Sequence, residues 1–139
     1  MIVLASAART ASGTAAFPEA VARVFGRCKR AQFLLDLTAA ATDSGDTLDV
    51  YVQSSVDNST WDDFIHFTQM LGNGGAKKFL AAFNADITPT TALGAPADAS
   101  LSAGVKQGPV GSYFRVKWVV VDASTANASF TFSIQAQPV

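Results

Sequence analysis

Two stretches of the chain repeat one pattern: residues 33–53 read FLLDLTAAATDSGDTLDVYVQ, and residues 114–135 read FRVKWVVVDASTANASFTFSIQ. In each stretch apolar and polar side chains alternate, a loop of small residues follows, and the alternation then resumes. Successive side chains of a strand point to opposite faces, so each stretch is predicted to form a pair of strands with one apolar face. Two such pairs that cover each other would form the core of a β-sandwich.

Further alternating segments lie outside these two stretches. They predict additional strands at residues 2–9, 61–68 and 76–83. Residues 11–16 are small and loop-like, and residues 19–26 fit either a short helix or an irregular strand. We therefore expect an all-β protein, an antiparallel and jelly-roll-like β-sandwich of about seven to eight strands.

The length and composition of the chain fit one domain that spans residues 1–139. Charged residues make up only 15% of the chain, well below the usual share of about a quarter. A surface so poor in charge is either partly covered by a partner or built from small polar residues such as Ser, Thr and Asn. The sequence leaves both explanations open.

The charge balance argues against nucleic acid as a partner. The formal net charge is −1, whereas nucleic-acid binding needs a concentrated basic face. One basic cluster stands out, at Arg23, Arg27, Lys29 and Arg30. Such a cluster would bind an acidic group or phosphate, but it is more often a solvated edge, which is the interpretation we favour.

Targeting signals are equally sparse. The N-terminal sequence MIVLASAARTASG lacks the charged start and apolar run of a secretory signal. No run approaches the roughly 18 apolar residues of a membrane span. The single cysteine, Cys28, allows no internal disulfide, and no base lies near it in sequence. We therefore expect synthesis in the cytosol, a structural role for Cys28 and no membrane partner.

A long segment at residues 84–111 lies between the strand predicted at residues 76–83 and the last two predicted strands. It is rich in Ala, Pro, Gly, Thr and Ser, and a loop longer than about 15 residues in a compact domain is usually functional or disordered. We expect an arm that is held by a neighbouring molecule and whose removal leaves the fold intact. The candidate partner-binding residues are in this arm and in the first strand: Ile87, Pro89, Leu93, Pro96, Leu101, Val105, Ile2 and Leu4.

Catalytic, cofactor and metal sites are not indicated, so we expect a protein that is not an enzyme. His66 is the only histidine and falls on the polar phase of its strand, which indicates an ordinary exposed side chain. Carboxylates gather around two loops, at Asp43, Asp46 and Asp49 and at Asp57, Asp62 and Asp63. Calcium is an alternative there, but neither group has EF-hand spacing, and turn chemistry explains both.

Aromatic residues offer a further alternative, a carbohydrate-binding platform. Tyr51, Trp61 and Tyr113 would form it if all three were exposed on one face. Packing in the core or at a sheet edge is the interpretation we favour. Residues 55–61 (SVDNSTW) also resemble the Asp-box hairpin of sialidases, with Ser59 where glycine is usual. That motif is a turn device away from the catalytic centre, so it implies a hairpin.

Four segments together resemble a known family. They are LASAARTASG at residues 4–13, the stretch 33–61 that ends in VQSSVDNSTW, YFRVKWVVV at 113–121 and ASFTFSIQAQ at 128–137. They resemble short virion proteins encoded among the head genes of tailed phages and prophages. The chain departs from that family in its insertion at residues 84–110 and in Asn58-Ser59, where the family often has Asp-Gly or Gly-Gly.

The resemblance implies a capsid decoration, or cement, protein at the capsid surface of a virion, made in the host cytoplasm. Its implied partners are the major capsid protein and further copies of itself, as a homodimer or homotrimer. We expect contact through an unpaired sheet edge and the long arm, by β-augmentation and apolar packing. A tail or connector component and a carbohydrate-binding module on the virion remain alternatives.

Overall fold

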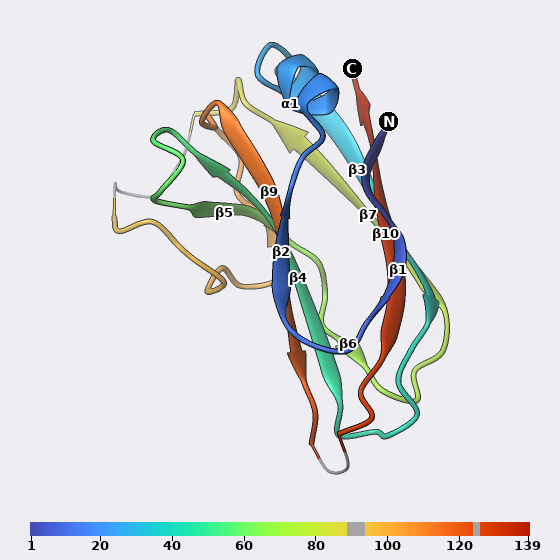
Figure 1. The fold of residues 1–139 in the computed structure, drawn as a ribbon. Helices are drawn as coiled ribbons and strands as arrows, with labels where there is room; N and C mark the ends of the chain where they lie inside the picture. Colours follow the sequence, from blue (N-terminus) through green and yellow to red (C-terminus); the bar gives the residue numbers. More distant parts are fainter. Residues whose placement is uncertain (89–93, 124–125) are drawn as a thin grey trace.

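The computed structural model describes residues 1–88, 94–123 and 126–139, and it shows two antiparallel β-sheets packed face to face (Figure 1). The first sheet has four strands in the order β1 (Ile2–Arg9), β10 (Phe130–Pro138), β3 (Arg30–Ala39) and β7 (Lys77–Asn84). The second has the order β2 (Gly13–Ala16), β9 (Tyr113–Val121), β4 (Thr47–Ser55), β5 (Asp62–His66) and β8 (Gly104–Val105), with β6 (Met70–Leu71) beside β4. The antiparallel β-sandwich is confirmed.

The two repeated stretches pair with each other. β3 lies beside β10 in the first sheet, and β4 lies beside β9 in the second. Each stretch therefore gives one strand to each sheet, which corrects the expectation that its two strands would share one apolar face. The connection at residues 40–46 is longer than a two-residue hairpin turn, and it crosses the roughly 10 Å between the sheets. This order is compatible with a jelly-roll-like arrangement.

The core lies between the sheets and contains the side chains that the alternation placed inward. The fully buried residues include Phe33, Leu35, Leu37, Leu48, Val50, Val52, Val116, Phe130, Phe132 and Ile134. Leu35 of β3 faces Ile134 of β10, and Val52 of β4 faces Val116 of β9. The large apolar area removed from water here is the main source of the stability of the fold.

A short helix, α1 (Glu19–Phe25), closes one end of the sandwich (Figure 1). Pro18 precedes it, and a proline fits a helix start because it has no N–H to leave unpaired. Phe25 is buried and meets Phe17 edge to face, with ring centroids 5.7 Å apart. The helix alternative for residues 19–26 is therefore the correct one.

The loop expected at residues 11–16 is instead partly a strand. β2 pairs with β9, with Gly13 opposite Trp118. A Cβ atom on Gly13 would lie 2.7 Å from the indole ring, so glycine lets the two strands approach around this large side chain. The sequence did not indicate this strand, because its small residues show no clear alternation of apolar and polar side chains.

One irregularity in β5 explains why Asp63 interrupts the apolar phase of that strand. Val52 pairs with Ile65, but the next residue of β4, Gln53, pairs with Asp63. Phe64 is the extra residue of a β-bulge. The bulge lets Phe64 and Ile65 both be buried, and it returns Asp63 to the outer face beside Gln53.

Candidate binding surfaces

The segment expected to be a free arm is folded onto the chain's own second sheet. We call residues 94–107 the strap. The strap runs along β5: Val105 pairs with Ile65, and the N–H of Lys106 donates to the carbonyl of Phe64 at 2.9 Å. The expectation that a neighbouring molecule holds this segment is therefore wrong for the strap, because β5 holds it.

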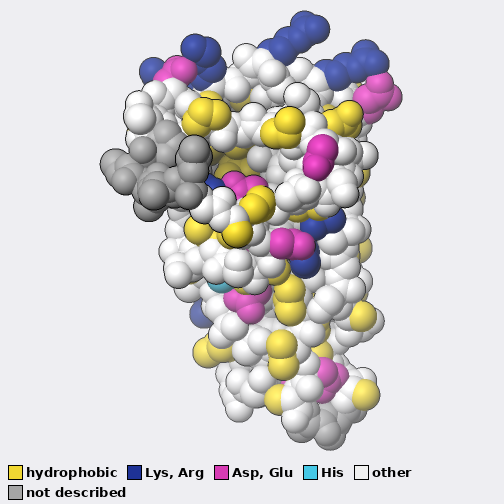
Figure 2. Space-filling view, turned by 90° about the vertical axis from the view of Figure 1, so that its left-hand side faces the viewer, with side chains coloured by type: hydrophobic (Ala, Val, Ile, Leu, Met, Phe, Trp, Pro, Cys, Tyr) yellow, Lys and Arg dark blue, Asp and Glu magenta, His cyan; other side chains and the backbone are white. Residues whose placement is uncertain are grey.

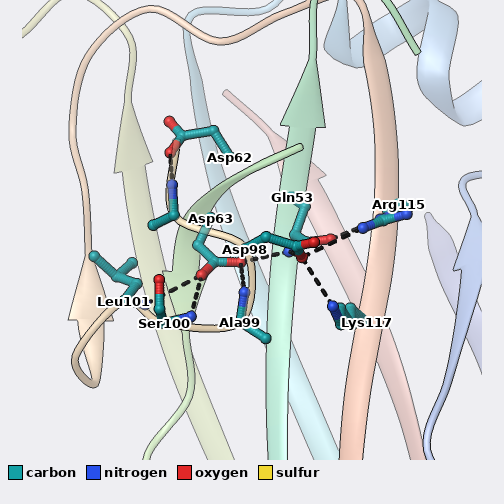
Figure 3. Close-up of polar contacts among 10 residues, drawn as sticks. Gln53, Asp62, Asp63, Asp98, Ala99, Ser100, Leu101, Arg115 and Lys117 are labelled. Carbon is teal, nitrogen blue, oxygen red and sulfur yellow. Dashed lines mark hydrogen bonds and ion pairs between the residues drawn. The ribbon is translucent and has the colours of Figure 1, made fainter. Parts of the chain in front are cut away.

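A buried carboxylate fastens the strap (Figure 3). Asp63 is fully buried and accepts hydrogen bonds from the backbone N–H groups of Ala99 (3.2 Å), Ser100 (2.9 Å) and Leu101 (3.1 Å). The side-chain amide of Gln53 donates to it as well, at 2.6 Å. An ionised carboxylate only accepts hydrogen bonds, so this set of donors matches its chemistry.

Asp98 forms a second fastening point on the outer face of the sheet (Figure 3). It accepts from Gln53 at 2.7 Å and from Lys117 at 2.9 Å, and it lies 3.4 Å from a guanidinium nitrogen of Arg115. The hydrogen bonds from Gln53 and Lys117 and the two positive charges hold the pKa of the Asp98 carboxyl below its usual value. Lys106 of the strap adds an ion pair to Asp62, at 2.6 Å.

His66 also contacts the strap. Its ring lies on the ring of Tyr51, with centroids 4.1 Å apart, and its Nδ1 is 2.7 Å from the carbonyl oxygen of Leu101. Its Nε2 is 3.0 Å from a carboxylate oxygen of Asp49. Only 11% of the His66 side chain is exposed, which corrects the expectation of an ordinary exposed residue. His66 joins the strap to β4 and β5.

The strap therefore belongs to the fold. The backbone N–H groups of Ala99, Ser100 and Leu101 supply three of the hydrogen bonds that Asp63 accepts, and deletion of the strap would remove them together with the residues that cover this carboxylate. That the fold tolerates deletion of the segment stays a prediction.

The structure places the candidate residues of the arm in different surroundings. Leu101 and Val105 are half-buried where the strap meets β5, whereas Ile87 and Pro96 are exposed. Pro89 and Leu93 lie outside the described residues. Of this group, Ile87 and Pro96 are the ones shown to be free for contact with a partner.

The two candidate residues in the first strand also differ in their exposure to solvent. Leu4 is buried in the core, where it faces Ile134, so it is not available to a partner in this structure. Ile2 is 61% exposed on the outer face of the first sheet. Pairing across the four strands places Ile2, Gln135, Leu34 and Leu80 in one transverse row on that face.

This row is the centre of a largely uncharged surface, which we call the outer face of the first sheet. Leu80 is 66% exposed there. The neighbouring row holds Gln137, Gln32 and Ala82. Farther along, Asp36 and Lys78 neutralise each other at 3.2 Å. Sequence alternation had marked these positions as outward, but only the register across four strands brings them together.

The edge strand β7 of the first sheet is partly capped. The side-chain amide of Gln107 donates to the carbonyl of Ala82 at 3.0 Å and accepts from the N–H of Asn84. These are the bonds that a neighbouring strand would make. Lys77 and Lys78 occupy the other half of β7, and lysines discourage the addition of a further strand. β-augmentation along β7 is therefore disfavoured.

Arg9 of the opposite edge strand, β1, lies where β1 meets β10. Its guanidinium donates to the carbonyls of Ala5 at 3.0 Å and Ala7 at 2.8 Å in β1 and of Phe132 at 2.8 Å in β10. It also lies over the ring of Phe132, 4.2 Å from the centroid, and burial lowers the pKa of Arg9. Arg9 therefore ties β1 to β10 and does not cap the outer edge of β1, so the cap at this sheet's edges is the one that Gln107 provides on β7.

Basic side chains gather at the α1 end of the molecule (Figure 2). Arg23, Arg27, Lys29 and Arg30 are all exposed. Arg23 pairs with Glu19, and Lys29 pairs with Asp86 at 3.0 Å. Neighbouring acids thus partly balance this cluster, which fits a solvated edge.

The carboxylate of Asp57 holds the backbone of the loop between β4 and β5. Asp57 accepts from the N–H groups of Ser59 (2.9 Å) and Thr60 (2.7 Å) and from the hydroxyl of Ser55, and these bonds lower its pKa. Within residues 1–88, 94–123 and 126–139, no group of three or more His, Cys, Asp or Glu side chains is placed to hold a metal ion. Turn chemistry accounts for Asp57.

Comparison with known proteins adds no relative to these observations. No family model, no curated protein and no solved structure matches the chain. Among the described residues, no helix is long and apolar enough to cross a membrane.

Proposed function

We propose that this chain is a non-enzymatic structural protein of a tailed-phage virion, a decoration protein that binds the outer surface of the capsid shell. The observation that carries the proposal is the row of exposed apolar and amide side chains on the outer face of the first sheet, with Ile2 and Leu80 at its two sides. The motif resemblance at residues 33–61 and 113–121 supplies the class of partner.

The chemistry of this face fits a protein partner. Exposed apolar side chains in a patch mark interaction sites. Here Gln135 lies within the apolar row, Gln32 and Gln137 lie on one side of it, and the Asp36–Lys78 ion pair lies on the other. Glutamine amides both donate and accept, so they adapt to the polar rim of an interface. Removal of Leu80 and Leu34 from water supplies the favourable free energy.

The size of the face favours attachment through many copies. Four strands of about eight residues cover a surface about 19 Å wide and 27 Å long, on the order of 500 Å². A stable interface usually buries about 800 Å² on each partner. A single copy would therefore bind weakly through this face alone, and a homodimer or homotrimer on a repetitive shell would gain through avidity.

The role of this face can be tested with Leu80→Lys. Empty shells assembled from the major capsid protein of the same phage or prophage are mixed with the purified chain and sedimented. We expect the wild-type chain to sediment with the shells and Leu80→Lys to remain in solution. The matched control is Val56→Lys, because Val56 is also exposed (84%) but lies in the loop between β4 and β5 of the second sheet.

Equal sedimentation of Leu80→Lys and the wild-type chain would exclude this face as the contact surface. No sedimentation of the wild-type chain would overturn the assignment to the capsid. The alternative of a tail or connector component is then examined by labelling whole particles with an antibody to the chain, since label confined to the tail would favour that alternative.

A further inference from the structure

A hollow of about 440 Å³ lies at the α1 end of the second sheet, away from the outer face of the first sheet. The loop between β4 and β5, the start of β9 and the strand β2 surround it. Trp61 and Tyr113 bring aromatic rings to the hollow, and Asn58, Ser112, Thr14 and Arg115 bring polar groups. Tyr113 is 46% exposed.

The cationic part of the lining is held in place. The guanidinium of Arg115 lies over the ring of Trp61, 4.2 Å from the ring centroid. Its Nε donates to Gln53 at 2.6 Å, and its Nη2 lies 3.4 Å from Asp98. Arg115 therefore fixes the position of the Trp61 ring, and its charge is already offset by Asp98.

The rim is preorganised as well. Asp57 holds the turn through the N–H groups of Ser59 and Thr60, and this turn carries Asn58 with a φ of 58°. Asparagine tolerates this left-handed conformation better than most residues. The Asn58 side chain is exposed at the edge of the hollow. A site whose rim is already ordered loses less entropy when a ligand binds.

We propose that this hollow binds a saccharide, with a pyranose ring against Tyr113 and Trp61 and its hydroxyl groups bonded to Asn58 and Ser112. A pyranose has an apolar C–H face and a polar rim, so it needs an aromatic surface next to donors and acceptors. Shallow hollows with a few convergent polar groups suit such a ligand better than a wholly apolar one.

The carbohydrate platform, which the sequence left as an alternative to core or edge packing, loses one member. Tyr51 is only 6% exposed and lies beneath His66, so it cannot contact a ligand. Trp61 and Tyr113 lie together, and Arg115, Asn58 and Ser112 are additions that the sequence did not indicate. The sequence could not indicate them because two segments far apart in the chain supply them.

The test uses the purified full chain on an array of neutral and carboxylate-bearing oligosaccharides, followed by calorimetric titration of the strongest probe. We expect saturable binding that Tyr113→Ala weakens at least tenfold, while Tyr113→Phe, which keeps the ring, retains most of it. Val121→Ala serves as the matched control, since Val121 is 49% exposed at the other end of β9.

Two outcomes would overturn the proposal: no probe binds at about 1 mM, or Tyr113→Ala binds as well as the wild-type chain. A hollow that takes a peptide would give the first outcome, and an oligosaccharide that binds elsewhere on the chain would give the second. The capsid sedimentation assay separates this proposal from the decoration role, because Tyr113→Ala leaves the outer face of the first sheet unchanged and is expected to sediment with shells normally.

Discussion

The carboxylate of Asp63 in β5 accepts a hydrogen bond from the backbone N–H of Leu101, 38 residues later in the chain, at 3.1 Å. This bond and its two neighbours from Ala99 and Ser100 turn a segment without regular structure into part of the sandwich. The strap then covers polar groups of the second sheet. The surface available to partners is therefore different from the one that an extended arm would offer.

Replacement of Asp63 should lower stability strongly. Asp63→Ala removes a fully buried acceptor and leaves the strap N–H groups and the Gln53 amide without it. We expect the free energy of unfolding to fall by roughly 3 kcal/mol, as for other buried hydrogen bonds to a charged group. Urea unfolding followed by circular dichroism measures the change.

Asp86→Ala is the matched control for this variant. Asp86 pairs with Lys29 at 3.0 Å, but 45% of its side chain is exposed, and such ion pairs contribute less than about 1 kcal/mol. If both variants lost the same small amount, Asp63 would not fasten the strap.

The contribution of Asp98 to the stability of the folded chain should depend on pH. Its pKa is lower in the folded chain than in the unfolded chain, so the stability that it contributes is present above its unfolded value, about 3.9, and is lost as the pH falls through the folded value. The contribution is small because half of the side chain is exposed. We expect Asp98→Asn to melt below the wild-type chain at pH 6.

The difference in melting temperature between Asp98→Asn and the wild-type chain should shrink as the pH is lowered below about 4. Differential scanning calorimetry at several pH values provides the comparison. A difference that grows toward low pH would show that the bonds from Gln53 and Lys117 do not favour the charged form of Asp98.

Gln107 should protect the edge strand β7 against association. Gln107→Ala removes the two side-chain bonds to Ala82 and Asn84 and frees backbone groups that another chain can pair with. We expect faster aggregation at a fixed temperature below the unfolding midpoint, measured by light scattering. Gln69→Ala is the control, because Gln69 bonds the side chain of Asp49 and caps no strand edge. Equal rates of aggregation of the two variants would show that Gln107 does not protect the edge of β7.

Gly111 should not tolerate a side chain. A Cβ atom at this position would lie 2.1 Å from the carbonyl oxygen of Ser55, so the backbone would have to move. We expect Gly111→Ala to lower the free energy of unfolding by about 1–3 kcal/mol, as overpacking does. Gly94→Ala, where a Cβ meets nothing within 4 Å, should leave stability within about 0.5 kcal/mol. A similar small effect of both substitutions on stability would contradict the close approach of Gly111 to the backbone of Ser55.

The candidate surfaces could be predicted from the sequence only in part. The outward positions of Ile2 and Leu80 follow from alternation, but their place in one row depends on the register of four strands. The strap was expected to extend outward because its composition resembles a loop. Its fastening depends on Asp63, whose outward direction results from the bulge at Phe64.

The residues of the main strands that face the core follow from the amino-acid order, because the alternation of side chains along a strand is a local property of the backbone. The tertiary structure alone decided which strands pair and that each repeated stretch divides between the two sheets. Backbone N–H and C=O groups are the same in every strand, so they do not specify which strand each one pairs with. Pairing is chosen by how the apolar faces of β3, β4, β9 and β10 fit together across the whole chain.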